Sequence, residues 1–207
     1  MKIHVLQLGT LGANCYIIET APAQCVAVDI GGSAERFLEF LRSKKLTLKK
    51  ILLTHGHFDH MGGVEAVRAA TGAEVYIHAD DAHKLENAES SLATHIPGER
   101  FTAVKEYIST IGDSFINDGK LCFKVMHTPG HSAGSVCYIC DDVIFSGDTL
   151  FRLSMGRTDF YDGSNGAMHN SLLRLSMLNG NYTVYPGHGE ETTLDFERNN
   201  NPYMQRL

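Results

Sequence analysis

The sequence has 207 residues, a formal net charge of −6 and 43% hydrophobic residues, which are ordinary values for a globular chain with a sizeable core. No run of about eighteen apolar residues is present, so we expect no membrane-spanning helix. The acidic balance argues against a nucleic-acid surface, because phosphate-binding proteins usually carry a basic stripe. The start, MKIHVLQLGT, lacks a basic segment followed by an apolar core, so we expect a strand, no signal peptide and a cytoplasmic protein.

The first half of the chain predicts short strands and helices separated by Gly, Asn and Pro. The predicted strands are residues 3–8, 15–19, 25–29, 51–53 and 74–78. Ser33 can cap a helix whose apolar residues recur at helical spacing as far as Lys45. A second helix is predicted over residues 62–70, with Gly72 as its stop signal. Residues 79–101 are polar and less regular, and we expect a helix and an excursion there; whether they form a lid is left open.

The second half repeats this pattern. The predicted strands are residues 121–127, 135–140, 143–145 and 183–185, and the predicted helices are residues 166–178 and a final one from Glu190. Strands followed by helices, twice over, indicate two similar halves packed sheet to sheet with helices outside. No linker divides them. We therefore predict a single domain, residues 1–207, with halves of about 1–110 and 111–207.

The five cysteines are an odd number without an export signal, so reduced thiols are expected. Cys137 and Cys140 have the spacing of a redox pair or of half a zinc site. They lie, however, in the apolar run GSVCYIC, which predicts a strand, and positions three apart in a strand face opposite sides. We therefore interpret them as structural.

Residues 54–60, THGHFDH, place three imidazoles and one carboxylate directly after a predicted strand. Imidazole and carboxylate are good zinc ligands, and zinc takes about four of them. On a tight loop with Gly56 at its middle, His55 and His57 can point to one centre while Asp59 and His60 point to a neighbouring one. A surface coincidence, or a set of hydrogen-bonded core groups, is the alternative, and the density of ligand types argues against it.

Three further candidates follow predicted strands: His131 in TPGHS, Asp148 in SGDT and His188 in YPGHG. Ligands at successive strand ends converge on one edge of a sheet, and the glycines beside them permit close approach. His127 ends a strand and is expected to pack. The remaining histidines lack ligand-like surroundings and are assigned surface or core roles: His4, His78, His83, His95 and His169.

The order Asp29, H-x-H-x-D-H at residues 55–60, then His131, Asp148 and His188 resembles the metallo-β-lactamase superfamily. The motifs TPGHS, SGDTLF, GRTDF and YPGHGEETT, followed by ERxxNP, are similar to short glyoxalase II-like proteins (hydroxyacylglutathione hydrolase-like). The resemblance covers nearly the whole chain. It implies an α/β fold, a four-layer αββα sandwich of two mixed sheets with helices outside.

The resemblance also implies a site for two divalent metal ions, which we expect to be zinc, with iron or manganese as alternatives. Its seven ligands would be His55, His57 and His131 for the first ion, Asp59, His60 and His188 for the second, and Asp148 as the bridge. Asp29 would support the ligand loop from behind, since such carboxylates orient ligand rings.

The implied reaction is hydrolysis of a small-molecule acyl thioester, of the S-lactoylglutathione type. Two ions that share a water lower its pKa from about 15.7 to about 7, giving a metal-bridging hydroxide, with Asp59 as the catalytic proton acceptor. Arg152 and Arg157 follow Asp148 and either contact an anionic substrate at the rim of the site or pair internally.

Full-length glyoxalase II enzymes carry a further C-terminal helical domain that contributes to glutathione binding. This sequence ends at Leu207, so we expect that domain to be absent, and the use of glutathione is left open. The nearest alternative is a mononuclear iron persulfide dioxygenase on the same fold, with similar H-x-H-x-D-H and GRTDF segments. An RNA-processing nuclease should show a basic surface, which the sequence lacks. The oligomeric state is left open.

Overall fold

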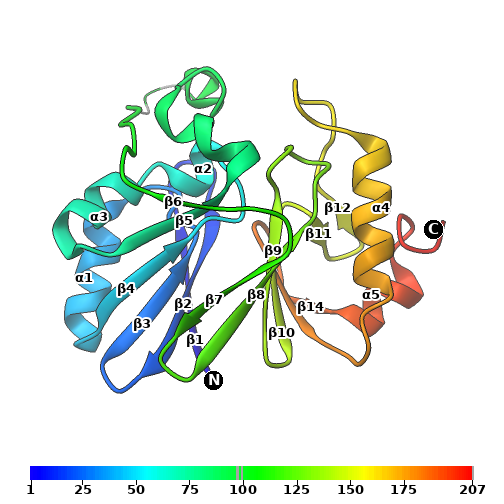
Figure 1. Cartoon of the computed structure of the whole chain (residues 1–207), viewed down its shortest axis with the longest axis horizontal. Coiled ribbons are helices and arrows are strands. Elements are labelled where there is room, and N and C mark those ends of the chain that lie inside the picture. The colour runs from blue at the N-terminus through cyan, green and yellow to red at the C-terminus, as the bar shows by residue number, and fades with distance from the viewer. Residues whose placement is uncertain (97, 99, 207) are drawn as a thin grey trace.

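Two six-stranded sheets form the centre of the fold, with helices on their outer sides (Figure 1). The computed structural model describes residues 1–96, 98 and 100–206. In the first sheet, β1, β2 and β3 pair antiparallel, and β3 to β6 pair parallel. Its strands, in their order in the sheet, are β1 (Lys2–Leu8), β2 (Ala13–Ala21), β3 (Gln24–Val28), β4 (Thr47–Leu52), β5 (Glu74–His78) and β6 (Ile108–Thr110).

The second sheet has the order β14-β13-β10-β9-β8-β7. Its strands are β7 (Ser114–Asp118), β8 (Leu121–His127), β9 (Val136–Cys140), β10 (Val143–Gly147), β13 (Thr183–Pro186) and β14 (Thr192–Thr193). β10 and β13 pair parallel, so their carboxyl ends meet at one edge. A separate hairpin follows β10 and consists of β11 (Leu150–Phe151) and β12 (Ser154–Met155).

The helices lie on the outer faces of the two sheets (Figure 1). They are α1 (Ala34–Lys44), α2 (Phe58–Met61) and α3 (Val64–Thr71) beside the first sheet, and α4 (Asn165–Ser176) and α5 (Leu194–Asn200) beside the second. Two 3₁₀ segments, η1 (Ala79–Glu86) and η2 (Ala93–His95), follow β5. Within the described residues, no helix is long and apolar enough to cross a membrane.

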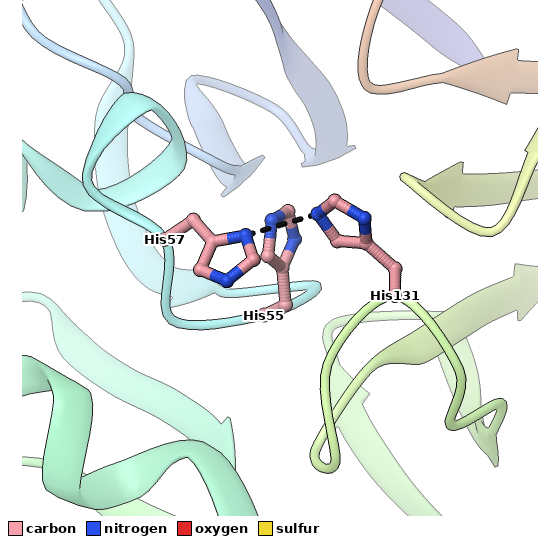
Figure 2. A group of neighbouring side chains, drawn as sticks. All are labelled: His55, His57 and His131. Carbon is pink, nitrogen blue, oxygen red and sulfur yellow. Dashed lines mark hydrogen bonds between the residues drawn. The ribbon is translucent and has the colours of Figure 1, made fainter. Parts of the chain in front are cut away.

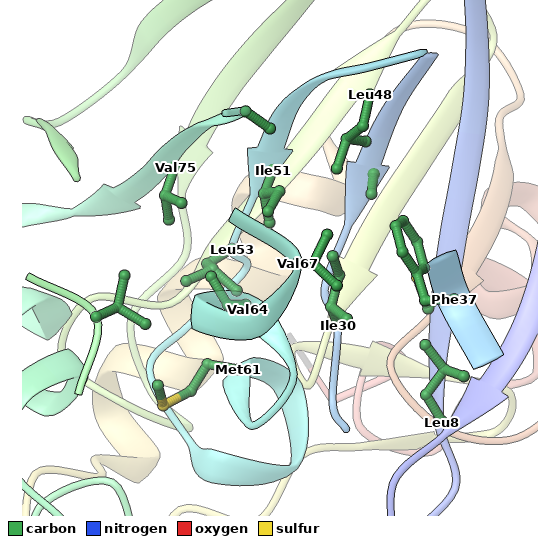
Figure 3. Packing of buried hydrophobic residues seen from close by; sticks show 14 of the residues in the cluster. Leu8, Ile30, Phe37, Leu48, Ile51, Leu53, Met61, Val64, Val67 and Val75 are labelled. Atoms are coloured by element: carbon green, nitrogen blue, oxygen red, sulfur yellow. The ribbon is translucent and has the colours of Figure 1, made fainter. Parts of the chain in front are cut away.

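Alternating side chains on the strands build three apolar cores. Cys15 and Ile17 of β2 belong to the core that packs against the helices of the first sheet. Phe37 of α1 lies in the same core (Figure 3). Tyr16 and Ile18, on the other face of β2, pack against the second sheet. A third core lies between the second sheet and α4. Because each sheet buries both faces, the fold is a four-layer αββα sandwich, which confirms the predicted α/β class.

Cys137 and Cys140 face opposite sides of β9, as predicted: Cys137 belongs to the core beside α4 and Cys140 to the core between the sheets. All five cysteines are free thiols. Burial raises the pKa of Cys137 and of Cys140 to about 11. Both thiols are therefore protonated at neutral pH, whereas a metal ligand would be a thiolate.

Several predicted boundaries were wrong. The final helix begins at Leu194, and not at Glu190, because Thr192–Thr193 first pair with β13 as β14. The helix predicted over residues 62–70 is α3 (Val64–Thr71), and Gly72 ends it in a left-handed conformation, whereas the short helix α2 before it was not predicted. Ser33 precedes α1 without a side-chain capping hydrogen bond. Strands β6 and β7 were not predicted, since their short, partly exposed segments lack a clear apolar alternation.

Candidate metal centre

The predicted ligands follow strands that end at the same edge of the sandwich. His55 and His57 lie between β4 and α2, and Asp59 and His60 lie in α2. The other three follow strands of the second sheet: His131 after β8, Asp148 after β10 and His188 after β13. The chain thus brings seven side chains together from four connections, which the sequence predicted from the strand ends.

The first group contains three buried histidines, His55, His57 and His131 (Figure 2). His57 Nδ1 lies 2.9 Å from His131 Nε2. The rings stand nearly perpendicular to one another, with centroids 4.7–4.9 Å apart. One nitrogen from each ring lies within 4.8 Å of the others, so the three rings converge on a single point.

The second group contains Asp59, His60 and His188. His188 Nε2 lies 3.1 Å from Asp59 Oδ2 and 3.3 Å from His60 Nε2. The distance between His60 Nε2 and Asp59 Oδ2 is 3.7 Å. His60 is fully buried, whereas the side chain of His188 is 30% exposed, so this group is the more open of the two.

Asp148 lies between the two groups. Its Oδ2 atom is 3.5 Å from His131 Nε2 in the first group and 3.8 Å from His188 Nε2 in the second. Its Oδ1 atom is 3.4 Å from His60 Nε2. A single carboxylate therefore contacts members of both groups, as the resemblance implied for a bridging residue.

Asp29 holds the ligand loop from behind. Its Oδ2 atom lies 2.8 Å from His60 Nδ1 and accepts a hydrogen bond of 2.7 Å from Thr54 Oγ1. Its Oδ1 atom accepts from the backbone N–H of Thr54 at 2.8 Å. The Asp29 backbone is left-handed, with φ of 55°, a conformation that aspartate tolerates better than most residues. These contacts leave His60 Nε2 free to face the second group.

Asp81 ties the two histidine loops together, and the sequence did not single it out. It accepts hydrogen bonds of 2.8 Å from the backbone N–H of Gly56, between His55 and His57. It also accepts from Ser132 Oγ and from the backbone N–H of Gly134, both at 2.8 Å. Its fourth partner is Lys84 Nζ at 2.9 Å. Asp81 lies in η1, inside the polar stretch of residues 79–101 for which the sequence predicted a helix and an excursion.

Burial sets the protonation of His55 and His57. It lowers the pKa of His55 well below its usual value and that of His57 to about 3. Both rings are neutral at pH 7, and their unprotonated nitrogens can bind a cation. Burial also acts to lower the pKa of His60, but the charge of Asp59, followed by that of two further aspartates, raises it. This excess of negative charge around one imidazole also favours a cation.

The residues fit divalent ions. His55 Nε2 and Asp148 Oδ1 are buried and form no hydrogen bond to any residue that the structure describes, whereas buried polar atoms normally have partners. The backbone also leaves room around them: a Cβ atom at Gly187 would lie 2.2 Å from Asp148 Oδ1 and 2.7 Å from His60 Cε1. Neutral imidazoles and carboxylates at this density are the ligand types that zinc and related ions take.

Both groups open into a cavity of about 640 Å³. Five of the predicted ligands line it: His57, Asp59, His131, Asp148 and His188. The rest of the lining comes from the β1–β2 turn, from residues 91–96, from the β11–β12 hairpin and from the loop that follows it. The stretch of residues 79–101 thus contributes one wall; residues 97 and 99 lie outside the described part of the chain.

The C-terminal ERxxNP motif holds the β11–β12 wall. The Glu197 carboxylate is fully buried and accepts a hydrogen bond of 2.8 Å from the backbone N–H of Leu153. Asn201 Nδ2 donates to Glu197 Oε2 at 2.8 Å and to the backbone oxygen of Ser154 at 2.9 Å. These hydrogen bonds anchor helix α5 to the β11–β12 hairpin, which contributes Phe151, Ser154 and Met155 to the lining of the cavity.

The two arginines predicted at the rim differ in position. Arg157 lines the cavity, and its guanidinium pairs with both carboxylate oxygens of Asp159, at 2.6 and 2.7 Å. Its backbone oxygen lies 2.8 Å from His131 Nδ1, a supporting contact that the sequence did not predict. Arg152 pairs instead with Glu190 at 2.9 Å, and does not belong to the described lining of the cavity.

The histidines that were given non-ligand roles lie outside this site, with one exception. His95 lines the cavity. His127 stacks on His78, with ring centroids 4.0 Å apart, as expected for packing. His83 contacts the Tyr161 hydroxyl at 3.1 Å, and His4 lies 2.8 Å from a glutamate of β2.

The family model of the metallo-beta-lactamase superfamily matches residues 8–188. The chain belongs to this superfamily, which confirms the resemblance seen in the motifs. Over 207 residues it is 34% identical to the probable metallo-hydrolase YqgX of Bacillus subtilis, covering 99% of this chain and 98% of the relative. It is 30% identical over 209 residues to the hydroxyacylglutathione hydrolase GloC of Haemophilus influenzae, again covering 99% and 98%.

Solved structures of similar proteins have the same fold. The BLEG-1 B3 metallo-beta-lactamase superposes with a TM-score of 0.92 at 35% identity, covering 98% of this chain and 99% of that one. TTHA1623, solved in a di-iron-bound form, gives a TM-score of 0.86 at 34% identity, covering 97% and 99%. Together the family, the relatives and the clustered His and Asp side chains indicate a metal-dependent hydrolase.

Proposed function

We propose that the protein is a thioester hydrolase of the glyoxalase II type with a dinuclear metal centre, preferentially zinc. The observation that carries the proposal is Asp148, a buried carboxylate in contact with both ligand groups at the floor of an open cavity. The 30% identity to GloC, a hydroxyacylglutathione hydrolase, supports the thioester as the bond that is cleaved.

The first ion would be held by His55, His57 and His131, and the second by Asp59, His60 and His188, with Asp148 between them. When bound there, two divalent ions supply polarisation of a carbonyl and a water molecule of lowered pKa. Asp59 lines the cavity, and its carboxylate accepts a proton as water adds to the thioester carbon. The carbon–sulfur bond then breaks, and that proton passes to the departing thiolate, leaving a carboxylic acid and a thiol.

A dinuclear centre accounts for more of the site than a mononuclear one. The contacts of 3.1 and 3.3 Å that His188 makes with Asp59 and His60 form a second converging set. A mononuclear iron persulfide dioxygenase would leave one of the two sets without an ion. Iron itself stays a candidate, since TTHA1623 was solved in a di-iron-bound form.

The test is thiol release from S-lactoylglutathione and from a neutral acyl thioester, by zinc-loaded protein beside the chelated form. Metal-dependent turnover of either substrate, with kcat/KM of about 10⁴ M⁻¹s⁻¹ or more, supports a thioesterase. Turnover of neither by protein shown to hold two zinc ions contradicts the proposal. Iron-loaded protein that consumes oxygen with glutathione persulfide would establish the dioxygenase instead.

A further inference from the structure

The cavity above the ligand groups is walled mainly by hydrocarbon. Six apolar side chains from four separate segments line it: Leu11, Leu92, Ile96, Phe151, Met155 and Phe160. Apart from the predicted ligands, the polar residues of the lining are Thr10, Ser91, His95, Ser154 and Arg157. A cavity of about 640 Å³ with such walls is of the size and kind that encloses a small, largely apolar ligand.

The arginine in the cavity wall already has a carboxylate partner within the protein. Arg157 is the single arginine of the described lining, which contains no lysine. Its guanidinium makes a two-pronged pair with Asp159, and it stacks on the Phe160 ring at 4.5 Å from the centroid. In the free protein, therefore, the Arg157 guanidinium already has a carboxylate partner, in a planar arrangement that suits arginine well.

A second hollow, of about 480 Å³, adjoins the cavity and adds negative charge. The two share Leu92, His95 and Phe160, so a substrate that extends out of the first passes along the second. The second hollow is lined by Glu89 and Asp159, both exposed. Because Asp159 pairs with Arg157, the net negative charge at this exit comes from Glu89, which repels an anionic thiol such as glutathione, a molecule with two carboxylates and one ammonium group.

We propose that the substrate of this site is an uncharged thioester with a hydrocarbon acyl chain, in preference to a glutathione thioester. The proposal rests on the thioesterase function above and specifies its substrate class. The acyl chain lies against the apolar wall, and the neutral thiol extends past Leu92 toward the acidic hollow. Hydrolysis adds water across the carbon–sulfur bond and yields a carboxylic acid and an uncharged thiol, as in the step described under the proposed function.

The experiment compares two thiols across one acyl series. Acetyl, butyryl, hexanoyl and octanoyl thioesters of N-acetylcysteamine, a neutral thiol, are assayed beside the same acyl groups on glutathione. The kcat/KM should rise by about fourfold for each methylene group that becomes buried. At each chain length the neutral thioester should have the higher kcat/KM.

Variants test whether the named wall is responsible. Leu92→Ala and Leu11→Ala should each lower kcat/KM for the hexanoyl thioester by about tenfold, and each should lower the ratio of the hexanoyl to the acetyl kcat/KM. Leu11 is 55% exposed in the free protein, so its replacement should not impair folding. Met177→Ala is the matched control, because Met177 is 72% exposed and lies outside the cavity lining.

Binding gives a readout that does not depend on turnover. S-alkyl thioethers of N-acetylcysteamine, which cannot be hydrolysed, should bind the metal-loaded protein more tightly with each added methylene group. If no thioester is hydrolysed but thioether affinity rises with chain length, the thioesterase function fails and the apolar site stands. The proposed substrate class would be overturned if neither kcat/KM nor thioether affinity increased with chain length. A higher kcat/KM for the glutathione series would also overturn it.

Discussion

Replacing Asp81 with asparagine removes one charge from a buried ion pair with little change in volume. Asp81 and Lys84 have side chains that are 0% exposed and lie 2.9 Å apart. Breaking a buried pair costs about 3–5 kcal/mol, because it leaves one charge uncompensated. Lys84 keeps a second partner, Asp162, at 2.7 Å. We therefore expect a loss of about 3 kcal/mol, which lowers the Tm of a chain of this size by about 6–12 °C.

The same substitution should weaken metal binding. Asp81 accepts hydrogen bonds from the loops of the first ligand group, through Gly56 and Ser132. Loss of contacts that orient ligands typically lowers metal affinity by about 10–100-fold. Thermal unfolding of the chelated protein gives the stability change, and competition with a chelating dye gives the zinc affinity. Asp80→Asn is the matched control, because Asp80 is the preceding residue and its side chain is 57% exposed.

The pH dependence supplies a check on the cause. Burial acts to raise the pKa of Asp81, but Lys84 and the hydrogen bonds from Gly56 and Ser132 lower it below its usual value. A carboxyl with a lowered folded-state pKa stabilises the fold above the unfolded pKa of about 3.9, and this contribution is lost as the pH falls through the folded value. The difference in Tm between the wild type and Asp81→Asn should therefore be equal at about pH 6 and about pH 8. A fall in Tm of less than about 2 °C, with unchanged zinc affinity, would refute the reasoning.

Four other variants test the site. Asp148→Ala should reduce the binding of both metal ions together, whereas His188→Ala should weaken mainly the binding of the second ion. Elemental analysis after zinc titration measures how many ions each variant holds. Equal loss of both ions in His188→Ala contradicts the assignment. Gly187→Ala places a Cβ atom 2.2 Å from Asp148 Oδ1. We therefore expect a lower zinc affinity and a decrease of about 1–3 kcal/mol in the free energy of unfolding. An unchanged zinc affinity would show that the backbone can shift at this position. Cys137→Ser/Cys140→Ser should keep its metal and activity, because the two thiols face different cores; loss of bound zinc would overturn their structural role.

Much of the fold follows from local patterns. The alternation on β2, which sends Ile17 to the helices and Ile18 to the second sheet, is a property of the strand backbone and is visible in the sequence. Loops that join strands to the next element carry the ligand motifs, each beside glycine. For this reason all seven ligand candidates could be named before the structure placed them near one another.

Contacts between distant segments required the structure. Asp81 is 25 residues from Gly56 and 51 residues from Ser132 along the chain, and its own stretch, ADDAHK, contains no motif that marks it as a partner of the ligand loops. The short strand β14 exists because it pairs with β13, whereas its local sequence indicated a helix. Only the packing shows that Arg157 pairs with Asp159 inside the cavity while Arg152 pairs with Glu190 beyond its described lining.

The sequence by itself thus determined the class of fold and the identities of the candidate ligands, because strand periodicity and motif spacing are local properties of the chain. The tertiary structure decided how Asp148 lies between the two groups, which residue ties the histidine loops, and what the cavity wall is made of. These depend on side chains that meet across two sheets. Their separations are set by the packing of the cores and not by any single segment.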